Sequence, residues 1–334
     1  MESTSLEIEI DGQTFTGKTP EELMENIVND RISQKGFNFI NVHNFKKLIE
    51  GIDRYEGEGE KEDKQKQTIS ACKILFEGFK EELKKLEKYK NEKEYNYVCR
   101  NIFAIINNLK NGSVRPRIDE ETKEKILKFA PLVVEVKGKY FIGQTPKKLM
   151  KDIINRGILQ KGFELYSDDY MKIVKEMNKY EGEGENKEQN RQKQIVLAYK
   201  MLFEKLEEYK NKEEYNYICE YIYNIIKYGI KNEIIKIDEK TREEILKLAP
   251  LVVKVNKKYF TGQTHEELME DIINRGMSQE GFSFDFSDCE NIVKEISRYE
   301  GEGENKEQNR QEQIVSAYKM LFEKLEEYKN KEEY

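Results

Sequence analysis

Three short stretches of the chain alternate apolar and polar residues, and each is followed by a longer stretch with helical spacing. In the first stretch, Leu6, Ile8 and Ile10 lie on one side of an extended chain, which predicts a strand with one buried face. Val134 and Val136 alternate with polar residues in the same way in the second stretch. We therefore expect a strand at the start of each of three segments.

A two-residue turn follows each alternating stretch. Asp-Gly is typical of a type I′ hairpin turn, because both central residues of that turn need a positive φ. The turns, with the phenylalanine of each expected return strand, are Asp11-Gly12 with Phe15, Lys137-Gly138 with Phe141, and Asn256-Lys257 with Phe260. Each segment is thus predicted to begin with a β-hairpin.

A helix is predicted directly after each hairpin. Its N-cap is a threonine, whose side chain can accept a hydrogen bond from a free backbone N–H: Thr19, Thr145 and Thr264. Pro20 and Pro146 follow two of these threonines, at a position where the missing N–H of proline costs no helical hydrogen bond. Glu22 and Glu267 complete a capping box, whereas the second segment has Lys148 there.

Two more helices complete each segment. Residues 36–39, 162–165 and 281–284, which share a Gly-Phe pair, form a candidate third strand, and a second helix follows them. The third and longest helix has apolar residues 4, 3, 4 and 3 positions apart, at Ile195, Tyr199, Leu202, Leu206 and Tyr209. The segment from Phe76 to Tyr89 in the first copy is seven residues longer than the equivalent segment from Phe203 to Tyr209 in the second copy. Seven residues are nearly two full helical turns, so we expect a longer helix with its buried face in register.

The segments are copies of one another. Residues 132–145 recur at 251–264 with an offset of 119, and residues 6–19 are the first copy. We expect an α+β fold, predominantly α: a tandem array of three repeated modules, each a β-hairpin plus about three helices, joined by two-helix connectors. Asp119 and Asp238 are expected to cap the second connector helix. The expected modules are residues 6–94, 132–214 and 251–334, and the expected connectors are residues 95–131 and 215–250.

Composition narrows the class of protein. The chain has 334 residues, a net charge of −7 and 37% charged residues, which suits amphipathic helices with charged outer faces. The absence of a basic excess argues against a nucleic-acid partner. No run approaches about 18 apolar residues and the start has no signal-peptide pattern, so we expect no membrane partner and a cytoplasmic location. Abundant Lys, Asn, Ile, Glu and Tyr, which have AT-rich codons, indicate a low-GC origin.

Residues able to carry out catalysis are few. His43 and His265 are the only histidines, occupy different positions of the repeat, and are both expected at the surface. Cys99 and Cys219 occupy equivalent positions on the apolar connector helix and are therefore expected to be buried. Because no CxxC pattern is present, their thiols are expected to be reduced. No catalytic triad or metal-ligand spacing is recognisable. We therefore expect no catalytic residue, no cofactor and no metal, and a protein that is not an enzyme.

The acidic sequence Tyr-Glu-Gly-Glu-Gly-Glu is the most distinctive part of the repeat, and it occurs at residues 55–60, 180–185 and 299–304. A Ca²⁺ loop would need glycine at its sixth position and glutamate at its twelfth, where the second copy has Asn186 and Gln192. Calcium is therefore disfavoured. Two interpretations remain, a solvated turn between helices and a loop that binds a partner.

The second and third copies are nearly identical over this part of the repeat. Residues 180–215 differ from residues 299–334 at two positions only. Either a constrained surface or a recent gene conversion explains this similarity, and the sequence favours neither. If the surface is constrained, the candidate binding residues are Tyr55, Glu56, Glu58, Glu60, Tyr180, Glu181, Glu183, Glu185, Gln189, Arg191, Tyr299, Glu300, Glu302, Glu304, Gln308 and Arg310.

These observations favour a non-catalytic, multivalent protein-binding or scaffolding repeat protein with an unknown protein partner, because linked similar sites gain avidity. A first alternative is a host-interaction or anti-defence inhibitor of a mobile element, whose acidic surface would mimic nucleic acid. A second alternative is an enzyme that uses carboxylates alone. Genomic neighbourhood and salt-dependent binding would distinguish the first alternative, and a deep pocket with converging acidic groups would support the second. The oligomeric state stays open.

Overall fold

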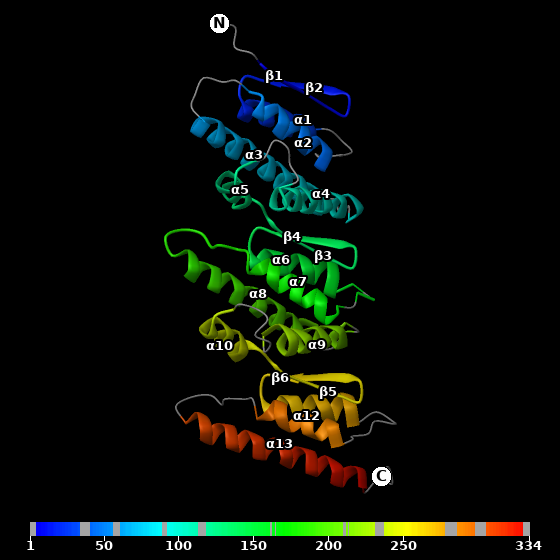
Figure 1. The fold of residues 1–334 in the computed structure, drawn as a ribbon. Helices are drawn as coiled ribbons and strands as arrows, with labels where there is room; N and C mark the ends of the chain where they lie inside the picture. The colour runs from blue at the N-terminus through cyan, green and yellow to red at the C-terminus, as the bar shows by residue number, and fades with distance from the viewer. Residues whose placement is uncertain are drawn as a thin grey trace. The chain divides into compact units, whose positions relative to one another are not determined.

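The computed structural model describes residues 5–33, 41–55, 61–88, 92–112, 118–160, 162–163, 165–209, 212, 214–230, 237–277, 286–297 and 305–329. These residues are mostly helical and contain three two-stranded antiparallel hairpins, which confirms the predicted α+β class with predominant helix (Figure 1). The chain divides into two compact units. Unit 1 contains Met1–Leu149 and Lys179–Glu181, and unit 2 contains Met150–Asn178 and Gly182–Tyr334. No described helix is long and apolar enough to cross a membrane.

The three predicted hairpins are present, each with five paired positions. They are β1 (Leu6–Ile10) with β2 (Gln13–Gly17), β3 (Leu132–Val136) with β4 (Lys139–Gly143), and β5 (Leu251–Val255) with β6 (Lys258–Gly262). Both central residues of every turn have positive φ, as a type I′ turn requires; for Asn256 and Lys257 the values are 45° and 62°. The turn prediction is therefore confirmed, even where neither central residue is glycine.

A helix starts directly after each hairpin, and the predicted threonine caps it. Thr264 Oγ1, for example, accepts a hydrogen bond from the backbone N–H of Glu267 at 3.2 Å. The capping boxes differ in detail from the prediction, because Glu267 Oε2 accepts from the N–H of Gln263, the residue before the cap. These helices are α1 (Pro20–Ser33), α6 (Pro146–Ile153) and α11 (His265–Ile272).

The last residue of each hairpin is a glycine that lies against the first turn of the following helix. A Cβ atom added to Gly262 would be 2.2 Å from the backbone nitrogen of Leu268. Gly17 and Gly143 are crowded in the same way by Leu23 and Leu149. The hairpin and the helix can pack this closely only because the position has no side chain.

Short π-helical segments were not expected from the sequence. They are η1 (Ile154–Ile158), η2 (Ile225–Ile230) and η3 (Ile273–Met277). Each continues a preceding α-helix with i→i+5 hydrogen bonding, which is rare and inserts an extra residue into a turn. In η1 and η3 an arginine in the π segment forms an ion pair with an aspartate four residues earlier, Arg156 with Asp152 and Arg275 with Asp271.

The second helices are α2 (Val42–Asp53), α7 (Ser167–Met177) and α12 (Phe286–Ile296). The third strand proposed before them is wrong in the second copy, where Gly162, Phe163 and Leu165 lie in irregular structure. Gly162 has a φ of 81°, and Leu165 is buried. Leu165 therefore packs in the interior although this segment forms no β-strand. The equivalent residues 36–39 and 281–284 lie outside the described residues.

The long third helices are α3 (Lys61–Lys88), α8 (Lys187–Tyr209) and α13 (Lys306–Lys329). The seven extra residues of the first copy lie within α3. This helix has 28 residues and α8 has 23, because α3 begins one residue later and ends one residue earlier than α8 when the two copies are aligned. The apolar face stays buried through the extension, at Phe79, Leu83 and Leu86. The predicted longer helix with an unbroken buried face is confirmed.

Two helices follow each of the first two long helices. They are α4 (Glu92–Lys110) and α5 (Glu120–Leu127), and α9 (Tyr215–Asn224) and α10 (Glu239–Leu248). Asp119 and Asp238 cap α5 and α10 as predicted, accepting from the N–H groups of Thr122 and Thr241, each at 2.9 Å. The helix α4 starts three residues before the predicted connector, because it includes Glu92.

The outer faces of the three hairpins differ in their surroundings. In unit 1, α4 packs on β3 and β4, and Asn96 Oδ1 accepts from the N–H of Tyr140 at 2.7 Å. In unit 2, α9 packs on β5 and β6, and Asn216 Oδ1 accepts from the N–H of Tyr259 at 3.3 Å. The outer face of β1 and β2 instead carries four exposed polar residues, Glu7, Glu9, Thr14 and Thr16.

Candidate functional site

The structure describes the acidic glycine loop only in its second copy. Among the sixteen candidate residues it describes Tyr55, Tyr180, Glu181, Glu183, Glu185, Gln189, Arg191, Gln308 and Arg310. The others, Glu56, Glu58, Glu60, Tyr299, Glu300, Glu302 and Glu304, lie outside the described residues. The geometry of the site is therefore taken from residues 180–191.

Two glycines determine the path of this loop. Gly182 and Gly184 have φ values of 81° and 77°, a region that side chains rarely adopt. A Cβ atom on Gly182 would lie 1.9 Å from the carbonyl oxygen of Lys187, in the first turn of α8. The Asn190 side chain also donates a hydrogen bond to the carbonyl oxygen of Glu183. The loop is thus folded back on the start of α8.

The carboxylates of the loop point into solvent. Glu181, Glu183 and Glu185 are exposed, and so is Gln189 on the first turn of α8. Glu181 forms a weak ion pair with Lys128 at 3.8 Å, within unit 1. Acidic side chains ahead of a helix also interact favourably with the positive end of its dipole. The loop therefore presents fixed negative charge next to a helix N-terminus.

Arg191 and Arg310 are held by the protein itself. Arg191 Nη1 donates to the carbonyl oxygen of Asn178 at 3.4 Å, just after α7, and its guanidinium pairs with Glu188 at 3.0 Å. Arg310 Nη2 donates in the same way to the carbonyl oxygen of Ser297 at 3.1 Å. Each arginine joins the two helices that flank the acidic sequence, which gives it a structural role in holding the ends of the loop.

The tyrosines of the sequence motif are only partly available. Tyr180 is half-buried. Tyr55 is also half-buried and packs against the core of unit 1. The surface offered to a partner is therefore mainly polar and acidic, and consists of Glu183, Glu185 and Gln189.

The cysteines are mostly removed from solvent. Cys72, Cys99 and Cys219 are buried, whereas Cys289 is exposed. Burial of Cys99 and Cys219 confirms the prediction. Burial also raises the pKa of the Cys72 and Cys219 thiols to about 12, which disfavours the nucleophilic thiolate.

The two histidines differ in their surroundings. His43 is exposed, as predicted. His265 is fully buried, so the expected surface position is wrong for that residue. It is the first residue of α11, and its Nε2 is hydrogen-bonded to the carbonyl oxygen of Ile296. Burial lowers the pKa of His265, and the residue is part of the core of unit 2. No group of three or more potential metal ligands occurs within the described part of the chain.

A buried polar cluster in unit 2 was missed by the sequence reasoning. Arg275 pairs with Asp271 and donates to the carbonyl oxygen of Tyr259 at 2.7 Å. Its guanidinium also lies over the ring of Tyr215, 4.4 Å from the centroid. The Tyr215 hydroxyl is 2.6 Å from Thr261 Oγ1. This cluster joins α9, β6, α11 and η3, so it fixes a hairpin between two helices.

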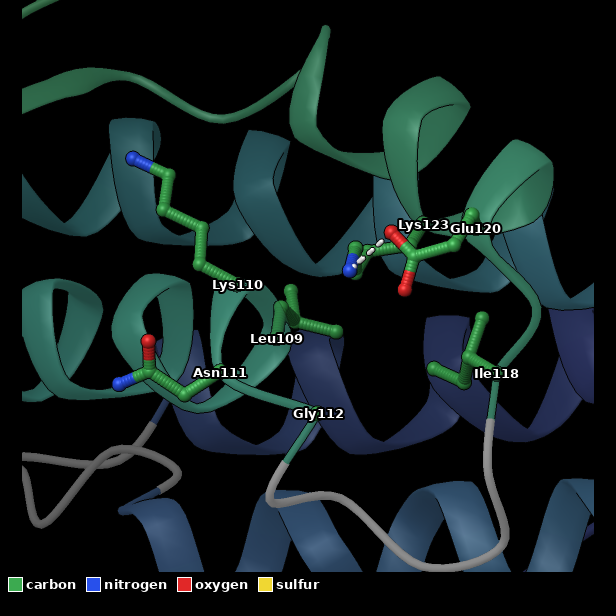
Figure 2. A pocket seen from close by; sticks show the side chains of 7 residues that line it. All are labelled: Leu109, Lys110, Asn111, Gly112, Ile118, Glu120 and Lys123. Atoms are coloured by element: carbon green, nitrogen blue, oxygen red, sulfur yellow. Dashed lines mark ion pairs between the residues drawn. The ribbon is translucent and has the colours of Figure 1, made fainter.

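A cavity of about 300 Å³ lies where α4 ends and α5 begins, and it too was missed. Figure 2 shows Leu109 and Ile118 on either side of it, the ion pair of Glu120 with Lys123 above, and Lys110 directed away. The lining residues are Leu109, Lys110, Asn111, Gly112, Ile118, Glu120 and Lys123. Glu120 and Lys123 pair with each other and Lys110 is directed away, so the cavity shows no converging set of reactive side chains.

Comparison of the chain with known protein families, curated proteins and solved structures finds no match. Support for a functional role of the acidic loop therefore comes from the geometry of this structure alone.

Proposed function

We propose that the chain is a non-catalytic, multivalent protein-binding or scaffolding protein, organised as a tandem array of three modules at residues 6–94, 132–214 and 251–334. Recurrent contacts support this arrangement. Gln65 Nε2 donates to Asp119 at 3.0 Å in unit 1, and Gln192 Nε2 donates to Asp238 at 3.1 Å in unit 2. Both join a long helix to the cap of the second connector helix.

The observation that carries the binding function is the exposed acidic surface of the second loop. Glu183 and Glu185 are exposed on a backbone that Gly182 fixes against α8. Because Gly182 and the Asn190 side chain hold the loop against α8, the loop itself would lose less conformational entropy when a partner binds. The expected partner surface is basic, since complementary charge accelerates and orients association. Three such loops on one chain would add avidity.

Charge reversal of the loops tests this proposal. The tagged chain is used to recover partners from the source organism, and the loop variant carries lysine at Glu58, Glu60, Glu183, Glu185, Glu302 and Glu304. The expected result is loss of the recovered partner. A matched control reverses the same number of charges at exposed glutamates elsewhere, including Glu243 and Glu244 of α10. Unchanged recovery with the loop variant would reject the acidic loops as the binding surface.

The identity and salt response of the partner then separate the remaining alternatives. A nucleic-acid enzyme whose binding weakens steeply with salt would favour the anti-defence inhibitor, because nucleic-acid mimicry depends on long-range charge. A partner that stays bound at moderate salt would favour a scaffolding role.

A further inference from the structure

A small pocket in unit 2 is lined by four aromatic rings and one carboxylate. It lies where η1, the start of α7 and α9 meet, and its volume is about 20 Å³. The aromatic residues are Phe163, Tyr170, Tyr217 and Tyr221, and the carboxylate is that of Glu220. These five residues are referred to below as the α9 pocket. Tyr217 is 38% exposed, so the pocket can be reached from solvent.

Glu220 supplies a fixed negative charge to the α9 pocket. Its Oε1 accepts a hydrogen bond from the Tyr259 hydroxyl of β6 at 3.1 Å, which orients the half-buried carboxylate. None of the described residues that line the pocket is basic. Burial raises the pKa of Tyr170, and the charge of Glu220 adds to this rise, so the carboxylate lies close to the Tyr170 hydroxyl.

This lining suits a cation. The face of an aromatic ring attracts a cation within about 6 Å of its centroid, and a carboxylate adds to that attraction. A metal ion would need several oxygen ligands, whereas the pocket offers one carboxylate. The Tyr170 hydroxyl is already hydrogen-bonded to Asn224. The Tyr221 hydroxyl donates to the Met150 sulfur at 4.0 Å. An ammonium group, which can donate to the carboxylate and lie against ring faces, fits this lining better than a metal ion.

The volume of the pocket limits the size of the cation. A cavity of about 10–15 Å³ holds one water molecule, so the α9 pocket has room for one group of similar size. The ammonium group at the end of an alkyl chain is compact and meets this limit. A quaternary ammonium group, with carbon on every valence of the nitrogen, is larger. The pocket is therefore selective for a primary ammonium group.

The equivalent positions of unit 1 have different chemistry. Arg100 and Asn101 on α4 correspond to Glu220 and Tyr221 on α9. Arg100 is exposed, and its charge would repel a cation. The neighbouring cysteines of the two helices, by contrast, are the same residue and are buried in both copies. The carboxylate is therefore not a requirement of the fold of the repeat, and it occurs beside the aromatic rings of α9.

We propose that the α9 pocket binds a primary alkylammonium group, either the end of a lysine side chain or a small free amine. The ammonium group would donate to Glu220 and lie against the rings of Tyr170 and Tyr217, with its alkyl chain directed to solvent. No residue of the acidic loops belongs to this pocket. This proposal and the proposed function can therefore fail independently of each other.

Titration of the full chain with methylammonium chloride tests the proposal. The NMR ring signals of Tyr217, identified from Tyr217→Phe, should shift in a saturable manner with a Kd on the order of 10 mM, the range expected for a ligand of about two non-hydrogen atoms. Glu220→Gln keeps an acceptor for the Tyr259 hydroxyl but removes the charge, and should weaken binding by about fivefold or more. Methanol, which is uncharged, and tetramethylammonium, which is larger, should give no saturable shift.

A matched control is Glu243→Gln, because Glu243 of α10 is exposed and lies outside the α9 pocket. Circular dichroism verifies that each variant retains the fold. Nα-acetyl-lysine methylamide identifies the source of the ammonium group: binding as tight as that of methylammonium supports a lysine side chain, and weaker binding supports a free amine. Absence of a saturable shift with methylammonium, equal affinity in Glu220→Gln, or equal binding of methanol or tetramethylammonium would overturn the proposal.

Discussion

Replacement of Arg275 by methionine should strongly destabilise unit 2. Arg275 Nε and Nη2 bind the two carboxylate oxygens of Asp271 at 2.5 and 2.6 Å, and Asp271 is only 5% exposed in its side chain. Methionine would leave this carboxylate buried, with the N–H of Thr261 donating to it at 2.9 Å. The effect is therefore dominated by an uncompensated buried charge.

The expected loss of unfolding free energy can be derived from the exposed fractions of the Asp271 and Arg275 side chains. Breaking a buried ion pair by removing one partner costs about 3–5 kcal/mol. The Arg275 side chain is 30% exposed, so water can partly replace it and the lower end of that range applies. We expect the free energy of unfolding to fall by about 3 kcal/mol. Since about 1.4 kcal/mol corresponds to a factor of ten, amide protection should fall by roughly a hundredfold.

Hydrogen exchange of β6 and α11 in the full chain is the appropriate assay, because it reports on unit 2 without assuming that the whole chain unfolds in one step. Arg242→Met is the matched control. Arg242 pairs at 3.0 Å with Glu239, which is 72% exposed, so its loss should cost under about 1 kcal/mol. The double variant Asp271→Asn with Arg275→Met should recover part of the stability, since no unpaired charge remains. Equal protection in Arg275→Met and Arg242→Met would refute the reasoning.

Three further predictions concern buried titratable groups. Maleimide should label Cys289 but not Cys219 in the folded protein, since burial raises the Cys219 pKa to about 12; mass spectrometry of a labelled native Cys219 would contradict this. Burial lowers the His265 pKa, so His265 should reduce stability as pH falls below its ordinary 6.5, and His265→Pro, which supplies the residue found at Pro146, should flatten that decline in urea melts between pH 7 and 5. Burial raises the Glu82 pKa, so Glu82→Leu should add about 1 kcal/mol at pH 7 and less near pH 4; a gain that is independent of pH would argue against this.

The elements that depend on local chemistry could be predicted from sequence. The hairpin turns follow from residues that accept positive φ, and the helix starts follow from side chains such as Thr264 and Asp238 that bind backbone N–H groups. The longer α3 follows from helical geometry alone, because seven residues preserve the buried face. None of these needs knowledge of distant contacts.

Features that depend on distant contacts could not be predicted. His265 occupies a helix start, normally an exposed position, but residues such as Ile296 cover it. The π segment η3 accompanies the contact of Arg275 with Tyr259, 16 residues away in sequence. In the candidate site, the alternating glutamates were visible in the sequence, whereas the attachment of Arg191 to Asn178 required coordinates. Turn and cap residues were therefore sufficient to predict the helices and strands. Which polar side chains remain accessible to solvent depends on tertiary packing.

The polar outer face of the first hairpin has a consequence for protein engineering. A helix such as α4 would have to desolvate Glu7 to cover β1, whereas on β3 it meets Val133 at the position of Glu7. Packing a helix on this hairpin by design would thus require a hydrophobic replacement at Glu7, whereas the position of Glu9 can stay charged, as it does at Glu135 of β3 and Lys254 of β5. Without a covering helix, the same change would leave an exposed hydrophobic side chain on the sheet and reduce solubility.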